Sequence, residues 1–160
     1  METRTVQAVL ASQWDGLLPI NPSAIAQRYG IEVIPLNPAE GLSGLADVRD
    51  DGTKIIGYNP NEPRYRIRFT IAHELAHHLL GHTQGNKACF RDFTEGNHYY
   101  ENPAIETAAN KFAAELLMPE KAITVAIERQ GVTKIAQLAN VFDVSESAMY
   151  WRLRNLGYAV

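Results

Sequence analysis

The apolar residues between positions 69 and 80 recur at intervals of three and four, which predicts a helix with one apolar side. On a helical wheel they share an arc roughly 140° wide. The arc holds Phe69, Ala72, Leu75, Ala76, Leu79 and Leu80. His73, Glu74 and His77 fall outside it. The predicted helix therefore has one side that suits a protein core and another that suits chemistry.

A second helical pattern runs from residue 102 to residue 118. Asn102 is a suitable N-cap, Pro103 suits the first helical position, and the pattern stops before another proline. Its apolar arc holds Ile105, Ala109, Phe112, Ala113, Leu116 and Leu117. Glu106 lies at the edge of this arc, whereas Glu115 lies on the far side, one turn from a lysine. We therefore expect Glu106 to point inward and Glu115 to be a solvated surface charge.

Shorter patterns complete a predicted α+β fold that is mainly helical. Further helices are expected at 3–14, 21–29, 120–130, 133–142 and 145–156. Strands are expected at 31–36, 43–48 and 53–58, which gives a small three-stranded sheet before the histidine-bearing helix. The last two helices resemble a helix-turn-helix, so residues 131–158 form a subdomain of one domain spanning 1–160. Residues 81–101 contain polar breakers and are expected to form a loop at the edge of the functional site.

Composition narrows the class of protein. A chain of 160 residues can bury a core as one domain, and a net charge of −3 gives no general attraction to nucleic acid or anionic membranes. The chain has no basic start followed by an apolar run, so we expect no signal peptide. It also has no run of eighteen apolar residues, so we expect no membrane span. A single cysteine excludes an internal disulfide. We therefore expect a soluble, cytoplasmic protein that has no membrane partner.

The motif His-Glu-x-x-His predicts the first half of a metal site. His73 and His77 are one helical turn apart and roughly 40° apart around the axis, so both imidazoles can reach one ion. Glu74 lies on the flank of the same side, where it can activate water at the metal without binding the metal. Glu74 is therefore the candidate general base. The alternative is a buried helix whose polar residues are only hydrogen-bonded.

A catalytic zinc ion needs a third protein ligand. We reject His78 because its side chain points roughly 100° from that of His77, and His82 because it points roughly 140° away if the helix continues. Glu106 is the preferred candidate, since a carboxylate that points inward among alanines needs a partner such as zinc. The alternative is a glutamate on a partly exposed edge. Asn110, one turn beyond Glu106, is a candidate for orienting that ligand.

Other candidates have weaker support. Arg66 could bind a substrate carboxylate or a neighbouring acid, or it could simply be solvated. His98, Tyr99 and Tyr100 close the predicted loop, where they could hydrogen-bond the oxyanion of peptide hydrolysis or pack against the helices. Cys89 is a candidate inhibitory fourth zinc ligand, because thiolates bind zinc strongly. The alternative for Cys89 is a small apolar loop residue.

Two sequence blocks are similar to those of the ImmA/IrrE metallo-endopeptidases of bacteria, phages and mobile elements. The first runs from Arg68 to His77, and the second contains Glu106, Ala109, Asn110 and the stretch from Phe112 to Pro119. The resemblance implies a gluzincin-like core of the zincin type. It also implies Zn²⁺ bound by His73, His77 and Glu106, with Glu74 as the base.

The resemblance further implies a biological role. Members of this family cut a partner transcriptional repressor, usually an Xre-type helix-turn-helix protein, and so derepress stress, phage or mobile-element genes after DNA damage. Two alternatives are a metal-dependent regulator that binds DNA and one that binds a protein without proteolysis. The helix-turn-helix-like segment invites the DNA-binding alternative, but its helices contain few basic residues. Direct DNA contact is therefore the less expected use of this segment.

Overall fold

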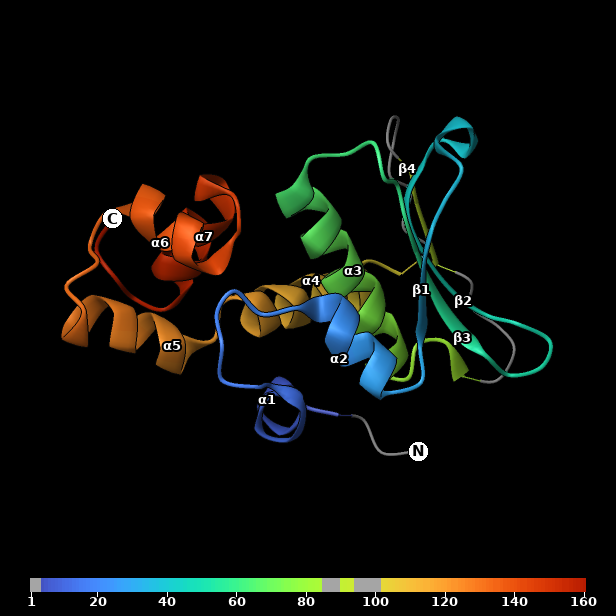
Figure 1. Cartoon of the computed structure of the whole chain (residues 1–160), viewed down its shortest axis with the longest axis horizontal. Coiled ribbons are helices and arrows are strands. Elements are labelled where there is room, and N and C mark those ends of the chain that lie inside the picture. Colours follow the sequence, from blue (N-terminus) through green and yellow to red (C-terminus); the bar gives the residue numbers. More distant parts are fainter. Residues whose placement is uncertain (1–3, 85–89, 94–101) are drawn as a thin grey trace.

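The computed structural model describes residues 4–84, 90–93 and 102–160, and its helices and small sheet confirm the predicted α+β fold. The helices are α1 (Val6–Gln13), α2 (Pro22–Arg28), α3 (Arg64–Leu79), α4 (Pro103–Leu117), α5 (Glu120–Thr124), α6 (Ile135–Phe142) and α7 (Glu146–Asn155). The strands are β1 (Glu32–Pro35), β2 (Leu42–Val48), β3 (Lys54–Tyr58) and β4 (Phe90–Phe93). The sheet lies at one end of the molecule and α5, α6 and α7 at the other, with α3 and α4 between them (Figure 1).

The sheet has the strand order β1-β3-β2-β4. Strand β1 is parallel to β3, and β2 is antiparallel to both β3 and β4. Strands β1, β2 and β3 confirm the three predicted strands. Strand β4 was not predicted, because it lies inside the segment expected to be a loop. Four residues are too few for a pattern to stand out, and β4 is a strand because the free edge of β2 pairs with its backbone.

Side chains cap the starts of α4 and α7, and the cap at Asn102 confirms the one predicted above. The side chain of Asn102 accepts a hydrogen bond from the Ile105 N–H at 3.4 Å, and that of Ser145 accepts one from the Ala148 N–H at 3.0 Å. The helix predicted at 120–130 is formed by α5 followed by a π-helical segment, Val125–Arg129. The starts of α4 and α7 can therefore be traced to short local signals.

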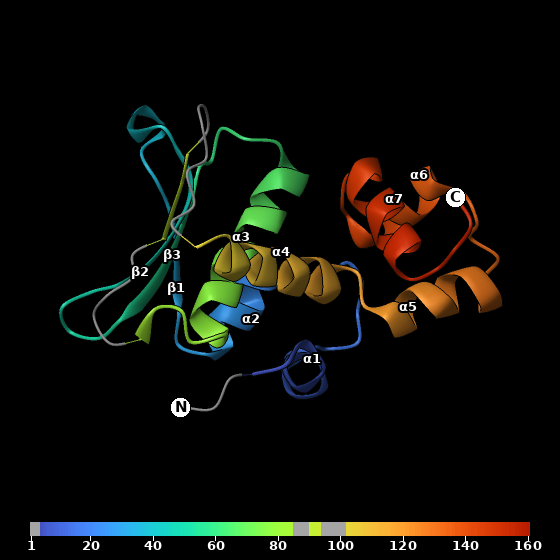
Figure 2. The same ribbon diagram turned by 180° about the vertical axis from the view of Figure 1, so that it is seen from behind.

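Helix α3 packs between the sheet and α4 (Figure 2). Its apolar side is fully buried at Ala72, Leu75 and Ala76, as the helical wheel predicts. Buried apolar residues form one cluster that extends from Val6 of α1 to Leu153 of α7. That residues 1–160 form one domain stays a prediction. Among the helices that the structure describes, none is both long enough and apolar enough to cross a membrane.

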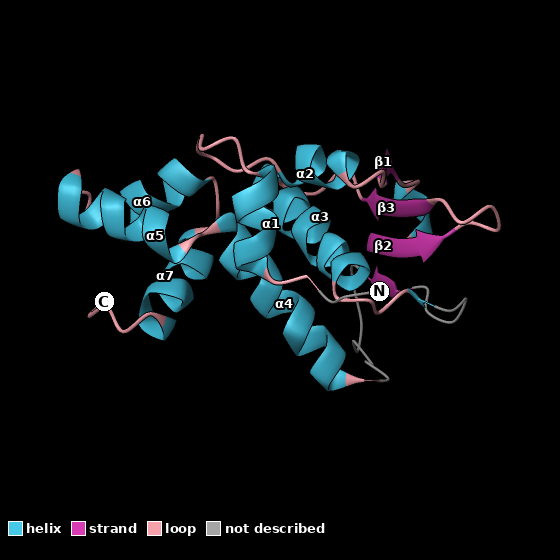
Figure 3. Cartoon of the chain, turned by 90° about the horizontal axis from the view of Figure 1, so that it is seen from below, coloured by secondary structure: helices cyan, strands magenta, loops and turns pink. Residues whose placement is uncertain are grey.

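The first turns of α3 hold the turn between α6 and α7. Arg68 of α3 donates hydrogen bonds to the carbonyl oxygens of Ile20 at 2.6 Å and Asp143 at 3.1 Å. Arg64 also donates to the Asp143 carboxylate, at 2.7 Å. Asp143 has a left-handed backbone (φ 53°), which aspartate tolerates better than most residues. The predicted helix-turn-helix-like pair is thus fixed to the base of α3, and Figure 3 shows the pair beyond the ends of α1, α3 and α4.

His78, which the helical wheel excludes as a ligand, is a buried structural histidine. Its Nδ1 lies 2.9 Å from the Thr83 hydroxyl oxygen, and its Nε2 lies 2.8 Å from the Ile55 carbonyl oxygen. Because a carbonyl oxygen can only accept, Nε2 carries the proton and Nδ1 accepts from the threonine. Burial lowers the pKa of His78 to about 4, so the ring is neutral near pH 7. His78 therefore links α3 to β3.

We expect His78→Leu to lower the free energy of unfolding by about 2–4 kcal/mol, because it leaves the Ile55 carbonyl and the Thr83 hydroxyl buried without this partner. Urea unfolding followed by circular dichroism measures the effect. Thr83→Val, which removes one of the two hydrogen bonds, should cause a smaller loss. Equal stability of the wild-type protein and His78→Leu would show that these bonds do not hold α3 on the sheet.

Candidate active site

Helices α3 and α4 bring together two histidines and two glutamates, which we call the histidine–carboxylate cluster: His73, Glu74, His77 and Glu106. All four are buried, with exposed fractions of 7% or less. The Nε2 atoms of His73 and His77 are 3.2 Å apart. The carboxylate of Glu106 lies 3.1 Å from Nε2 of His73 and 3.4 Å from Nε2 of His77. Glu106 therefore points inward, as its place on the helical wheel predicts.

These distances fit the donors of a tetrahedral metal site. Zinc bonds of about 2.0–2.1 Å at tetrahedral angles separate neighbouring donor atoms by about 3.3 Å. The separation of the two Nε2 atoms is close to that value, and so are the distances from Nε2 of His73 to Oε2 of Glu106 and from Nε2 of His77 to Oε1 of Glu106. A carboxylate oxygen of Glu74 also lies within 4.8 Å of donor atoms of both histidines. The Glu106 oxygens lie closer to the histidines, at 3.1 and 3.4 Å. The geometry thus favours Glu106 as the third donor and leaves the Glu74 carboxylate beside the group.

The charge of Glu106 suits this arrangement. Burial disfavours its ionised form, but hydrogen bonds from His73 and His77 outweigh burial and lower the pKa of Glu106 to about 2. Glu106 is therefore an anion at neutral pH. Two neutral imidazoles and one carboxylate are a donor set that catalytic zinc sites use.

Strand β2 has a glycine where the Glu74 side chain meets the sheet. A Cβ atom on Gly44 would lie 2.7 Å from Oε1 of Glu74 and 2.5 Å from Cγ2 of Thr70, closer than such atoms approach in proteins. The pairing of β2 with β4 is also irregular between Leu42 and Gly44. The missing side chain at position 44 therefore makes room for the Glu74 carboxylate.

We expect Gly44→Ala to lower kcat for peptide hydrolysis by about tenfold to a hundredfold, because its Cβ atom would displace the Glu74 carboxylate. Gly57→Ala is the matched control. A Cβ atom there would meet Leu36 at 2.5 Å, so it perturbs the same sheet without touching Glu74. Equal kcat values for the two folded variants would contradict the proposed link between Gly44 and Glu74.

Two side chains that the sequence did not assign to the site contact His77. Nδ1 of His82 lies 2.9 Å from Nδ1 of His77. The ring of Phe90, in β4, stacks on the His77 ring with a centroid separation of 3.9 Å and an interplanar angle of 7°. Burial, with a further contribution from His77, lowers the pKa of His82. His82 is therefore a neighbour of the donor set, although it was rejected as a ligand.

Arg66 forms an ion pair with a neighbouring acid, which is one of the alternatives that the sequence predicts. Its Nε atom lies 3.2 Å from Oε2 of Glu62, one turn earlier, and about half of its side chain is exposed. The same Glu62 oxygen accepts a hydrogen bond from the Ser43 hydroxyl at 3.0 Å. Glu115 pairs with Lys111 at 3.9 Å, as predicted, although its side chain is only partly exposed.

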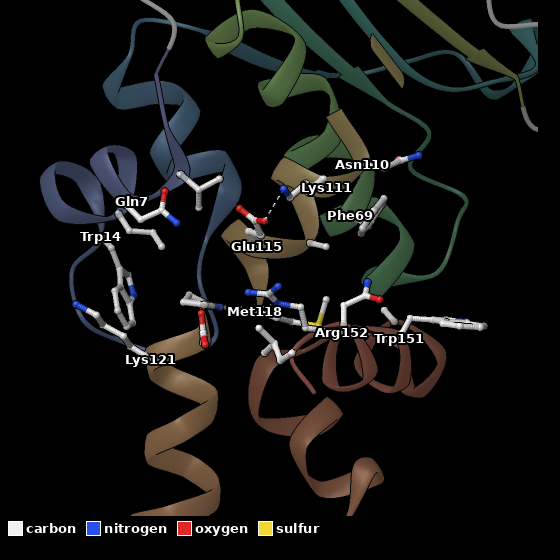
Figure 4. A pocket seen from close by; sticks show the side chains of 18 of the residues that line it. Gln7, Trp14, Phe69, Asn110, Lys111, Glu115, Met118, Lys121, Trp151 and Arg152 are labelled. Atoms are coloured by element: carbon white, nitrogen blue, oxygen red, sulfur yellow. Dashed lines mark hydrogen bonds and ion pairs between the residues drawn. The ribbon is translucent and has the colours of Figure 1, made fainter. Parts of the chain in front are cut away.

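Asn110 is exposed and lines a groove of about 1100 Å³ between α1, α4 and α7. Figure 4 shows it there with Phe69, Lys111, Glu115, Trp151 and Arg152. No member of the histidine–carboxylate cluster lines this groove among the residues described. The role of Asn110 in orienting Glu106 stays a prediction.

Four candidates lie outside the described residues: Cys89, His98, Tyr99 and Tyr100. Their suggested roles as an inhibitory zinc ligand and as oxyanion donors stay predictions. The described neighbour of that segment, β4, does lie at the site, because its Phe90 contacts His77.

Comparison with known proteins gives three relatives and one family. The chain is 38% identical over 90 residues to the radiation response metalloprotease IrrE of Deinococcus radiodurans, covering 55% of this chain and 27% of that protein. It is 41% identical over 88 residues to IrrE of Deinococcus deserti, covering 53% and 31%. It is 32% identical over 100 residues to the uncharacterized immunity region protein 2 of Bacillus phage phi105, covering 62% and 60%.

The chain thus spans less than a third of the length of either IrrE protein. The model of the M78 peptidase family, described as the IrrE N-terminal-like domain, matches residues 26–154. That range contains all of α3 and α4 and therefore the whole histidine–carboxylate cluster. The resemblance drawn from the two sequence blocks is confirmed: the chain belongs to the IrrE N-terminal-like peptidase family.

Proposed function

We propose that this chain is a zinc-dependent endopeptidase whose active site is the histidine–carboxylate cluster. One observation carries the proposal: the Nε2 atoms of His73 and His77 lie 3.2 Å apart, and each lies within 3.4 Å of a carboxylate oxygen of Glu106, with the Glu74 carboxylate beside them. The metal itself is inferred from the chemistry of the donors, since two imidazoles and a carboxylate suit zinc. The relatives named as metalloproteases support the same class of activity.

Each residue of the cluster has a separate role in this proposal. His73, His77 and Glu106 hold the ion, which would polarise the scissile carbonyl and acidify a water molecule when bound. Glu74 takes a proton from the attacking water and delivers it to the leaving amine. Its carboxylate is fully buried between α3 and Gly44 of β2, so it is held in one place and is little screened by solvent.

The proposed substrate is a transcriptional repressor of the Xre helix-turn-helix type, acting in the cytoplasm. Two relatives are named for the radiation response and one for a phage immunity region, which fits a protease that removes a repressor under stress or DNA damage. Cleavage would derepress stress, phage or mobile-element genes. The single cysteine is consistent with a reducing compartment.

We infer that the helix-turn-helix-like pair, α6 and α7, supports the peptidase fold and does not read DNA. Arg152 of α7 donates to the Met118 carbonyl oxygen at 2.9 Å, at the end of α4. Arg154 lies over the rings of Tyr150 and Trp151 on its own helix. The turn of the pair is held by Arg64 and Arg68. Both arginines of the second helix thus have partners within the chain.

The test is a cleavage assay with purified, zinc-loaded protein and the helix-turn-helix repressor encoded nearest its gene. We expect one discrete pair of fragments, lost on chelation and restored by added Zn²⁺. Casein serves as an unstructured second substrate. Cleavage of casein but of no repressor would refute the substrate and leave the enzyme class standing. Cleavage of neither by the zinc-loaded protein would refute the peptidase.

A further inference from the structure

The C-terminal end of α3 turns the chain back over its own last turn. The N–H of Gly81 bonds to the carbonyl of His78 at 3.2 Å, and the N–H of His82 bonds to the carbonyl of His77 at 2.9 Å. Gly81 has a φ of 80°, in the left-handed region that glycine adopts without strain. These two bonds and this glycine define a Schellman motif. The motif places the residue after the glycine beside His77.

The side chains of His82 and His77 then meet through their Nδ1 atoms, 2.9 Å apart. In a metal site built from the Nε2 atoms of the cluster, Nε2 of His77 would no longer donate to Glu106, and its lone pair would face the ion instead. The proton of a neutral His77 ring must therefore be on Nδ1, from which it can be donated. His82 must accept it through an unprotonated Nδ1. Only one pair of neutral tautomers satisfies both the ion and this hydrogen bond.

Phe90 restrains the same ring from a different direction. Its stacking on His77, with an interplanar angle of 7°, opposes tilting of the imidazole out of its plane. The hydrogen bond to His82 opposes rotation within that plane. His77 is fully buried, and two segments that follow α3 in the chain thus restrain it.

We propose that His82 is a positioning residue for the metal site, which accepts the Nδ1 proton of His77 and so directs the Nε2 lone pair of His77 toward Glu106 and His73. This inference rests on the proposed function only in assuming that the cluster binds a metal ion. Histidine ligands commonly donate their second N–H to a fixed acceptor, and loss of that acceptor weakens metal affinity by about 10–100-fold. When the acceptor is a second histidine, as here, its own Nδ1 must also be unprotonated.

The test compares three substitutions of His82 in the full chain. Phenylalanine keeps a planar ring but accepts no hydrogen bond. Asparagine places its Oδ1 atom where the histidine has Nδ1, so it can accept the proton of His77. Glutamine has its acceptor one bond further out and is the matched control for asparagine. Zinc affinity is measured by competition with a chromophoric chelator, and the ligand field by the visible absorption of the Co²⁺-substituted protein.

We expect His82→Phe and His82→Gln to bind zinc about 10–100-fold more weakly and to shift the Co²⁺ bands, while His82→Asn stays within about threefold of wild type. If His82→Phe does not fold, the zinc affinities and Co²⁺ spectra of His82→Asn and His82→Gln still test the proposal. Wild-type affinity and spectra in both the phenylalanine and glutamine variants would overturn the role of His82 and leave the metal site standing. A wild-type protein that binds neither Zn²⁺ nor Co²⁺ would overturn the proposed function, and this inference with it.

Discussion

Glu74→Gln is expected to lower kcat for peptide cleavage by about 10²–10⁴-fold, because an amide cannot take a proton from the attacking water. Glutamine has nearly the same shape as glutamate, so it should still fit beside Gly44 and leave the metal donors in place. The measurement is kcat on a peptide that spans the cut site, together with the zinc content of the purified variant.

The zinc content gives this prediction its control. A variant that has lost both zinc and activity would indicate a damaged site, whereas one that retains zinc and loses cleavage assigns the proton transfer to Glu74. In cells, the repressor fragment should appear after DNA damage with wild type and be absent with Glu74→Gln. If the variant still derepresses the target genes without a fragment, the protein acts by binding its partner and the peptidase proposal fails.

Glu106→Gln is expected to have the second large effect, on metal binding. The substitution removes the negative charge of the donor set and offers a weaker oxygen donor to the ion. Loss of a direct ligand should weaken zinc affinity by more than the 10–100-fold that follows loss of a hydrogen-bonding neighbour. Competition with a chelator measures the affinity, and activity should return only in part at saturating Zn²⁺.

Helix α4 offers a matched control for this substitution. Glu115→Gln removes a carboxylate from the same helix, where it pairs with Lys111 at 3.9 Å near the surface. We expect it to leave zinc affinity unchanged. Similar affinities for the two variants would exclude Glu106 as the third ligand. The third ligand would then be expected among the residues that follow α3.

The sequence predicts the elements of the site well because their signals are local. The helical periodicity of α3 and α4, the Asn102 cap and the Ser145 cap each depend on a few neighbouring residues, and the structure has all of them. The inward position of Glu106 follows from the same periodicity, because a residue at the edge of an apolar arc lies close to the core.

The relationships that the sequence did not predict depend on a chain reversal or on pairing between distant residues. His82 was rejected on the assumption that α3 continues, whereas Gly81 ends the helix and returns His82 to His77. Glycine at that position is a known stop signal and could have indicated the reversal. Strand β4 and the stacking of Phe90 have no such local signal, because both depend on the free edge of β2. The space at Gly44 likewise exists only between two packed elements.

The partly buried guanidinium of Arg68 has a consequence for the way this chain unfolds. It joins α3 to Ile20 on one side and to Phe142 and Asp143 on the other, across 48 to 75 residues of sequence. Separating either end would break these charge-assisted hydrogen bonds, each of which contributes about 1.5–3 kcal/mol. We therefore expect the helix with the histidines and the C-terminal pair to open together. Hydrogen exchange should therefore give their slowest amide hydrogens the same free energy of opening, equal to that of global unfolding.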